Sequence, residues 1–501
     1  YKFGFYDSNT QALDKIAFNA PYYLITKSAG NSRSENGPDF TKGEYYFLKN
    51  TRDSSNIIRA KNDGYDIIST TGTAKNILTV GAIESIQQTP NLASEIRVSN
   101  FSSWGPTDDG RIKPDIMGVG TDILSTSNTS NAAYTTLDGT SMSSPQVAGS
   151  LLLLQQLYNR LNKGKFMRSA TLKGLVIHTA MDFGPEGPDY QSGWGLLNAE
   201  SAAKVIQNTD KTHAIRELSL NNGTLYTEKF IASGAGNVRV TLAWTDPEGN
   251  VLPLISSSLN NRSPRLVNDL DIKIQDSKGT FLPFTLDPDN PSALAKTGVN
   301  NLDNVEKIII PQSIPGETYT LSINHKGTLK NNQQDFSLLI SGIGGNAYCN
   351  LNPSTSNIIL TKLMVDNKAV ANTLDSTGTA LMIETGETKP VNIQFSNTTT
   401  KNIRAVVDWN QDGDFDDVNE LINTTTNITG NNFNFSITSP SGVAVDKRYK
   451  LRIICSNDPI NSSCGSFSNG NSLEASIQIL QASNDIAAIG ISTTVGNFCQ
   501  N

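Results

Sequence analysis

The hydrophobic pattern of this chain changes character near residue 206, and that change limits the folds open to it. Before it, apolar runs typical of buried strands at Tyr22–Thr26 and Ile77–Gly81 alternate with helical periodicity at about 141–162 and 169–179. The segment Leu13–Asn19 is short and mixed. Strands that alternate with helices favour a parallel sheet covered by helices. We therefore expect residues 1–206 to belong to an α/β domain.

The rest of the chain has strand patterns only, in two segments that predict two all-β sandwich or jelly-roll domains. Residues 215–343 carry strands expected at Asn237–Trp244, Leu270–Ile274, Val305–Ile310, Tyr319–Ile323 and Phe336–Ile340. Residues 346–482 are rich in Asn and Thr, with strands expected at Ile358–Leu363, Val391–Phe395, Ile403–Trp409 and Tyr449–Ile454. Residues 483–501 are expected to be a linker or the start of a further module.

Composition excludes several classes of function. Lys and Arg total 40 against 47 Asp and Glu, a net charge of −7 that gives no electrostatic footprint for nucleic acid. No apolar run approaches the roughly 20 residues that span a bilayer. The four cysteines, which all lie in the last third, allow three pairings, and Cys455–Cys464 would close a short loop; the others are Cys349 and Cys499. We expect an exported protein, secreted or at the cell surface, with optional disulfides.

The string Gly139-Thr140-Ser141-Met142-Ser143-Ser144-Pro145-Gln146-Val147-Ala148-Gly149 carries the clearest chemistry. Gly-Thr-Ser is typical of a tight turn that opens a helix, with Pro145 in its first turn, so Ser141 is expected at or just inside the helix N-terminus. Unpaired N–H groups and the positive end of the helix dipole meet there and stabilise negative charge. The short string alone favours a capping serine over a nucleophile.

The whole string resembles the serine motif of the subtilases, the subtilisin-like serine peptidases. Flanking segments agree with that resemblance over roughly residues 1–206: Ser28-Ala29-Gly30-Asn31, Ser99 to Pro106, Asp109 to Ile116 and Gly193-Trp194-Gly195. The resemblance implies that Ser141 is the nucleophile and that the Asn31 amide stabilises the oxyanion beside the Ser141 N–H. It also implies substrate binding by Ser28, Ala29, Gly30, Gly139 and Thr140, with protein or peptide substrates.

The chain departs from the subtilase pattern in its histidines. Subtilases order their triad as Asp, His and Ser along the chain, but here the first histidine is His178, followed by His213 and His325. We expect His178 to be structural within a packed helix and the other two to face solvent. Asp7 stands too close to Asn31 to be the triad acid. The triad Asp and His are therefore expected to be missing from this chain, the first domain being the C-terminal part of a catalytic domain.

Three functions remain open on this evidence. The first is a secreted serine endopeptidase that works through an acyl-enzyme, of which residues 1–501 alone would be nearly inactive. The second is a catalytically inactive surface or binding protein on the same scaffold, with an unknown carbohydrate or surface ligand. The third, an esterase, is disfavoured because the Gly-x-Ser-x-Gly elbow is absent around Ser141.

Two acidic segments raise the question of calcium. Leu266 to Asp271, Trp244-Thr245-Asp246, Asp303 and Glu306 resemble the jelly-roll barrel that follows the catalytic domain in some subtilases, several of which bind calcium. The run Asp408 to Asp417 resembles part of the GEVED domain, an extracellular β module, although Glu474 stands in a degraded form of its name-giving string. Oxygen ligands at positions one, three and five and glycine at six indicate structural calcium; the expected ligands are Asp408, Asn410, Asp412 and Asp414.

Overall fold

The computed structural model describes residues 3–33, 64–86, 95–234, 236–276, 279–311, 313–349, 351–353, 360–365, 368–372, 380–445, 447–467 and 469–481. The chain divides into two compact units, one formed essentially by residues 1–345 and the other by 346–501. Short segments at 234–236 and 314–316 belong to the second unit. The predicted segment 483–501 lies outside the described residues, and the predicted domain boundaries stay a prediction.

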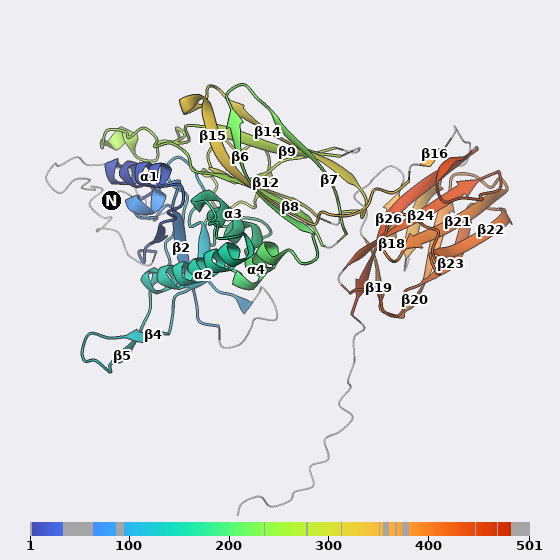
Figure 1. Cartoon of the computed structure of the whole chain (residues 1–501), viewed down its shortest axis with the longest axis horizontal. Helices are drawn as coiled ribbons and strands as arrows, with labels where there is room; N and C mark the ends of the chain where they lie inside the picture. The colour runs from blue at the N-terminus through green and yellow to red at the C-terminus, as the bar shows by residue number, and fades with distance from the viewer. Residues whose placement is uncertain are drawn as a thin grey trace, which may run out of the picture. The chain divides into compact units, whose positions relative to one another are not determined.

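The first unit opens with a parallel α/β layer, as predicted. The strands β1 (Thr26–Ser28), β2 (Leu78–Ile83) and β3 (Ile116–Val119) are parallel and adjacent in that order, with Val80 opposite both Ser28 and Ile116. The long helix α2 (Thr140–Leu161) covers one face of this sheet (Figure 1), because Val147, Leu151 and Leu154 pack onto the strand side chains. Helices α3 (Ser169–Thr179) and α4 (Ala199–Gln207) extend the same core.

One local prediction in this layer was wrong, and one segment without a predicted element is a helix. The strand expected at Tyr22–Thr26 begins only at Thr26, and Tyr22 and Tyr23 are each 60% exposed. Leu13–Asn19 is part of a full helix, α1 (Ser8–Asn19). Asp7 caps α1 by accepting hydrogen bonds from the backbone N–H groups of Asn9 and Thr10, both at 3.0 Å. A 3-10 turn (Thr70–Thr73) lies beside α1, and the hairpin β4 (Ile123–Thr126) and β5 (Tyr134–Leu137) leads into α2.

The second layer of this unit is an antiparallel sandwich of two four-stranded sheets, as expected. One sheet has the order β13-β8-β15-β6 and the other β10-β9-β14-β7, and their facing apolar residues form one core. The strands are β6 (His213–Asn221), β7 (Tyr226–Ile231), β8 (Val238–Trp244), β9 (Asp269–Gln275), β10 (Thr280–Phe281), β13 (Val305–Ile310), β14 (Thr318–Lys326) and β15 (Gln333–Ser341). A small pair, β11 (Phe284–Thr285) and β12 (Lys296–Thr297), lies beside them.

The α/β layer and the sandwich share buried contacts through α3, every residue of which is buried. Leu339 from β15 enters the same apolar cluster as Leu175 and Val176 of α3. A fully buried ion pair joins the layers: the Lys75 ammonium contacts the Asp246 carboxylate and donates to the carbonyls of Pro247 (2.7 Å) and Arg265 (2.8 Å). With this set of acceptors around the ammonium, the pair fixes the two layers against each other.

Replacement of Lys75 by methionine is expected to lower the free energy of unfolding by about 3–5 kcal/mol, because it leaves the buried Asp246 carboxylate without its cation. Urea denaturation of residues 1–501, followed by tryptophan fluorescence, measures the change. Lys204→Ala is the matched control, since Lys204 pairs with Glu200 on the solvent side of α4 and should leave the midpoint unchanged. Equal, small effects of the two variants would show that the buried pair does not join the layers.

The second unit is also a sandwich, as predicted. Its two sheets have the strand orders β18-β17-β20-β23 and β19-β26-β24-β21-β22. The strands are β17 (Leu360–Val365), β18 (Lys368–Asn372), β19 (Leu381–Glu384), β20 (Thr388–Phe395), β21 (Lys401–Asp408), β22 (Leu421–Ile428), β23 (Asn432–Thr438), β24 (Arg448–Ser456) and β26 (Gly470–Leu480), with a small parallel pair β16 (Leu351–Pro353) and β25 (Gly465–Phe467). Among the described helices of both units, none is long and apolar enough to cross a membrane.

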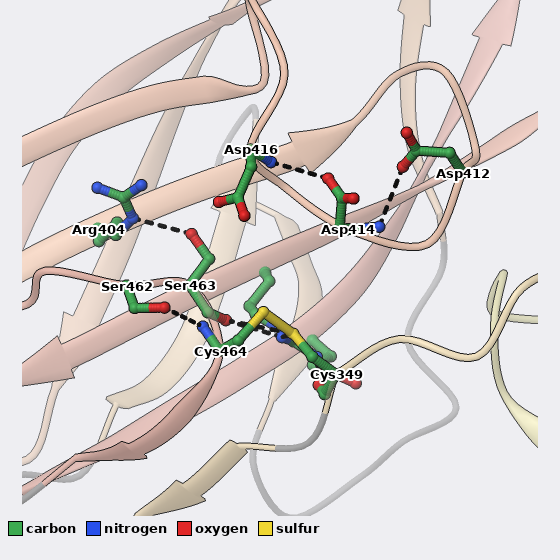
Figure 2. Close-up of a disulfide and its surroundings, with 10 residues drawn as sticks. Cys349, Arg404, Asp412, Asp414, Asp416, Ser462, Ser463 and Cys464 are labelled. Carbon is green, nitrogen blue, oxygen red and sulfur yellow. Dashed lines mark hydrogen bonds and ion pairs between the residues drawn. A yellow bond between two sulfur atoms is a disulfide. The ribbon is translucent and has the colours of Figure 1, made fainter.

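The disulfide prediction needs correction. Cys464 is joined to Cys349, 115 residues away, with the two Cα atoms 5.5 Å apart (Figure 2). Cys455 is a free, fully buried thiol in the apolar core, where it lies on β24. A short loop between two cysteines favoured the wrong pair, because the alternation of strand side chains turns Cys455 into the sandwich interior. Burial also raises the pKa of the Cys455 thiol to about 12.

Loss of this disulfide is expected to lower the stability of the second unit by about 2–5 kcal/mol, because it closes a long loop of the unfolded chain. Guanidinium unfolding with and without reductant measures the change, and the double variant Cys349→Ser/Cys464→Ser should reproduce the reduced state. Cys455→Ala should keep the full sensitivity to reductant. Loss of that sensitivity in Cys455→Ala would show instead that Cys455 is the partner of Cys464.

Candidate functional site

Ser141 is the second residue of α2 and is exposed, as the sequence predicted. Gly139 precedes the helix with a φ of 147°, a backbone conformation that favours glycine, and its N–H donates to the Gly120 carbonyl at 2.7 Å. Pro145 lies one turn further into the helix than expected. Because proline has no N–H, the Ser141 carbonyl lacks its usual intrahelical donor.

Asn31 closes the N-terminus of α2 from a distant part of the chain. Its side-chain oxygen accepts from the Thr140 backbone N–H at 2.9 Å and from the Thr140 hydroxyl at 2.7 Å. A backbone N–H can only donate, so these bonds fix which end of the amide is oxygen. The remaining end, Nδ2, lies beside Gly139, where a Cβ atom would come within 3.0 Å of it. Asn31 thus acts as a remote cap and presents an N–H₂ donor at the helix start.

The chain before Asn31 is held in place by Ser103 and Thr140. Gly30 has a φ of 117°, its carbonyl accepts from the Ser103 N–H at 2.9 Å, and its N–H donates to the Thr140 hydroxyl at 3.2 Å. A Cβ on Gly30 would lie 2.9 Å from the Ser103 hydroxyl oxygen. Ser28 ends β1, and buried Ala29 donates its N–H to the Val80 carbonyl at 2.8 Å. The structure therefore brings together every residue that the resemblance named around Ser141.

Two hydrogen-bond donors at this site are free. The N–H groups of Gly139, Thr140 and Met142 have acceptors, but within the described residues the Ser141 N–H has none. The Asn31 Nδ2 also donates to no residue that the structure describes. Two exposed donors beside the positive end of a 22-residue helix form a site for a small negative charge. The Ser141 hydroxyl belongs to the same residue as one of them.

The three histidines all lie elsewhere. His178 is 1% exposed in α3 and hydrogen-bonds Thr241 at 2.9 Å and Ser341 at 2.6 Å. Burial, together with the nearby charges of Lys307 and Arg239, lowers the pKa of His178 well below its ordinary value. His213, expected to face solvent, instead begins β6, is half-buried and hydrogen-bonds Ser341. His325 on β14 accepts from the Gly223 N–H.

The acidic loop of the second unit gathers a partly different set of carboxylates from the one expected. Oxygens of Asp412, Asp414 and Asp417 all lie within 4.8 Å of one another, and the three side chains are exposed. Side-chain to backbone hydrogen bonds connect this part of the loop: the Asp414 N–H donates to the Asp412 carboxylate, and the Asp416 N–H donates to the Asp414 carboxylate (Figure 2). Asp417 lies at the end of the run Asp408 to Asp417, so the density of acidic residues in that run could have indicated it as a ligand.

The other two expected ligands, Asp408 and Asn410, use their side-chain oxygens in hydrogen bonds within the loop. Asp408, at the end of β21, is buried and accepts from the N–H groups of Gln411 (2.5 Å) and Gly413 (3.1 Å). The Asn410 side-chain oxygen accepts a hydrogen bond from the Asp412 N–H, and the Asn410 Nδ2 donates to the carboxylates of Asp412 and Asp417. Burial, with the nearby carboxylates of Asp408 and Asp412, raises the pKa of Glu420 to about 7 beneath this loop.

Family comparisons agree with both parts of the chain. Residues 4–195 match the model of the subtilase family, and residues 402–472 match that of the GEVED domain. Residues 4–195 therefore belong to the subtilase family, and residues 402–472 form a GEVED domain. The parallel sheet, the helix that begins at Thr140 and the two sandwiches fit this assignment.

Individual relatives share only part of their length with this chain. A C5a peptidase of Streptococcus pyogenes is 39% identical over 162 residues, which is 30% of this chain and 13% of that protein. The Serine protease/ABC transporter B family protein tagA of Dictyostelium discoideum is 25% identical over 222 residues, or 38% and 12% of the two chains. A psychrophilic subtilisin-like protease from Pseudoalteromonas is 11% identical, covering 40% of this chain and 68% of its own, with a TM-score of 0.27.

Proposed function

We propose that this chain is the serine-bearing part of a secreted or cell-surface serine endopeptidase that cleaves protein or peptide substrates. The observation that carries the proposal is the pair of free donors, the Ser141 N–H and the Asn31 Nδ2, at the start of α2. A capping serine would use its side chain to satisfy an N–H of its own helix. Here the Asn31 side-chain oxygen accepts from the Thr140 N–H instead, and the exposed Ser141 hydroxyl remains available for chemistry.

The geometry supports acyl transfer at Ser141. Attack of the Ser141 hydroxyl on a peptide carbonyl places negative charge on the carbonyl oxygen, which the two free donors can stabilise. A donor of this kind is worth roughly 10²–10³ in kcat. The attack also needs a base to take the hydroxyl proton, and the chain's histidines are held by other partners. We propose that the triad Asp and His lie outside residues 1–501.

A second candidate function is a binding protein on an inactive subtilase scaffold. The observation that favours it is the commitment of His178 to Thr241 and Ser341 in a fully buried setting. Without a base, Ser141 is an ordinary hydroxyl, and the oxyanion donors alone give little rate. This candidate predicts no peptidase activity in any form of the protein.

Peptide hydrolysis by two forms of the protein separates the candidates. Residues 1–501 and the product purified from its native source are incubated with casein and with a library of fluorogenic peptides. The endopeptidase proposal expects cleavage by the native product and almost none by residues 1–501. A native product that contains this chain and cleaves nothing would establish the scaffold function, while full activity of residues 1–501 would show that the base lies within them.

We also propose that the acidic loop holds a structural calcium ion through Asp412, Asp414 and Asp417. Three exposed carboxylates within 4.8 Å repel one another, and hard oxygen ligands suit that ion. The donor set fits in chemistry, and the Asn410 amide, which donates to two of the three carboxylates, partly offsets their repulsion. Asp408 is left out of this set because it is hydrogen-bonded within the loop.

Addition of 1 mM CaCl₂ to chelator-treated protein is expected to raise the melting temperature of the second unit, because an ion that binds only the folded state stabilises it; this concentration is on the order of the dissociation constants of extracellular calcium modules. Asp414→Asn should abolish the increase. Asp416→Asn, a neighbour outside the three, should keep it. Equal responses of both variants, or no response of the unaltered protein, would remove calcium from the loop.

A further inference from the structure

A cavity of about 290 Å³ lies in the first unit between the end of α3 and the strands β8 and β13 of the sandwich. It shares no residue with the site at Ser141. Its lining combines apolar walls from Trp194, Phe284 and Ile309 with three charged side chains, Asp182, Arg239 and Lys307. Nothing in the proposed peptidase chemistry uses this cavity.

The two cations reach the cavity from neighbouring strands. Arg239 on β8 is directly opposite Ile309 on β13, and Lys307 is two residues from Ile309. Opposite residues share a face of an antiparallel sheet, and so do residues two apart on one strand. Arg239 and Lys307 are therefore on the same face, the one that packs toward α3. The fold places two like charges side by side over a partly apolar cavity.

Neither cation forms a salt bridge with a residue that the structure describes. Lys307 is 6% exposed and donates one hydrogen bond, to the Ile177 carbonyl at 2.9 Å. The guanidinium of Arg239 makes no hydrogen bond or salt bridge to any residue in the described ranges. Asp182 at the exposed rim is the carboxylate of the lining, and one of its oxygens accepts from the Gly187 N–H. With both cations protonated, the cavity carries one excess positive charge.

Arg239 is half-buried, and its guanidinium, at a partly apolar cavity and without a protein acceptor among the described residues, can take an anionic ligand as its partner. Five N–H donors in a planar fork match a carboxylate, which can accept two of them in parallel. The walls formed by Trp194, Phe284 and Ile309 suit an apolar substituent next to that carboxylate. We propose that this cavity binds a small monoanionic carboxylate with an apolar chain, held by Arg239 and Lys307. The ligand is a free organic acid or the C-terminal residue of a peptide, since the two share this chemistry.

Calorimetric titration of residues 1–501 tests the proposal with 4-methylpentanoate as the free acid and N-acetylleucine as the peptide C-terminus. At least one of the two should bind, and the tighter one identifies the source. The neutral 4-methylpentanamide should bind at least tenfold more weakly, because it lacks the charge that the two cations require. Equal binding of acid and amide, tighter binding of inorganic phosphate, or no binding at 10 mM ligand would overturn the proposal.

Two variants connect the binding to the cavity. Arg239→Gln should weaken carboxylate binding by roughly tenfold to a hundredfold, the usual effect of losing a charged hydrogen-bond partner. Arg216→Gln is the matched control, since Arg216 pairs with Glu228 on the sandwich surface and should leave the affinity unchanged. An unchanged melting temperature for both variants confirms folding. Equal affinities of the two variants would place the carboxylate elsewhere.

The pH dependence adds an independent readout. Burial, with the charge of Arg239, lowers the pKa of Lys307 to about 7, while Asp182 opposes this shift. His178 also faces this charge and is neutral, because burial lowers its pKa. Affinity should therefore fall as the pH rises from 6 to 8, when Lys307 loses its proton. Lys307→Met should bind more weakly and show no such fall, and a pH-independent affinity in the unaltered protein would exclude Lys307 from the site.

Discussion

If the proposed peptidase function holds, Ser141→Ala is expected to reduce kcat of the native product by about 10⁴- to 10⁶-fold, with little change in KM or stability. The hydroxyl is exposed and caps no backbone N–H of its helix, so its removal costs the fold almost nothing. Steady-state hydrolysis of a fluorogenic peptide measures the loss. Ser144→Ala, on the same helix but buried, is the control and should retain activity.

Residual activity of Ser141→Ala above one part in a thousand would contradict the assignment of the nucleophile. A large fall in melting temperature in that variant would instead show a structural role for the hydroxyl.

Asn31→Asp is expected to lower kcat by at least about 10²–10³ while leaving the protein folded. The aspartate keeps an oxygen that accepts from the Thr140 N–H and hydroxyl, so the remote cap of α2 survives. It removes the Nδ2 donor and adds negative charge where the oxyanion would form. A peptide-hydrolysis assay and a thermal melt of the same preparation measure the two effects.

Asn31→Ala separates the two roles of this residue. It removes the cap as well as the donor, so it should lose activity and also about 1 kcal/mol of stability. Equal stability of the two variants would show that Asn31 does not cap α2, and full activity of Asn31→Asp would remove it from the oxyanion site.

The sequence predicted the layered architecture well because periodicity reports directly on burial. The α3 prediction, 169–179, coincides with the observed helix, and the strand at Val305–Ile310 is also unchanged. Local hydrophobicity wrongly predicted a buried strand at Tyr22 and Tyr23, because these two side chains are exposed in the structure. The helix at Ser8–Asn19 was missed because its apolar face is weak, with Ile16 half exposed, although Asp7 carried a capping signal.

The site depended on contacts that no local pattern contains. Asn31 and Thr140 are 109 residues apart, and only the resemblance to the subtilases paired their segments. That Asn31 caps α2, which leaves the Ser141 N–H free, emerged from the structure. The Cys349–Cys464 pair joins residues 115 apart, and the Arg239–Lys307 cavity likewise depends on the register of β8 against β13. Register is set by packing, so composition and spacing along the chain do not reveal it.

The central claim, that Ser141 is an activated nucleophile, is tested most directly by covalent labelling. The native product is treated with a fluorophosphonate, which reacts with activated serines, and the modified residue is located by peptide mass spectrometry. We predict a single adduct on the peptide that contains Ser141, and no adduct after heat denaturation or in residues 1–501 alone. A native product that leaves Ser141 unmodified, or carries the adduct on another serine, would contradict the account.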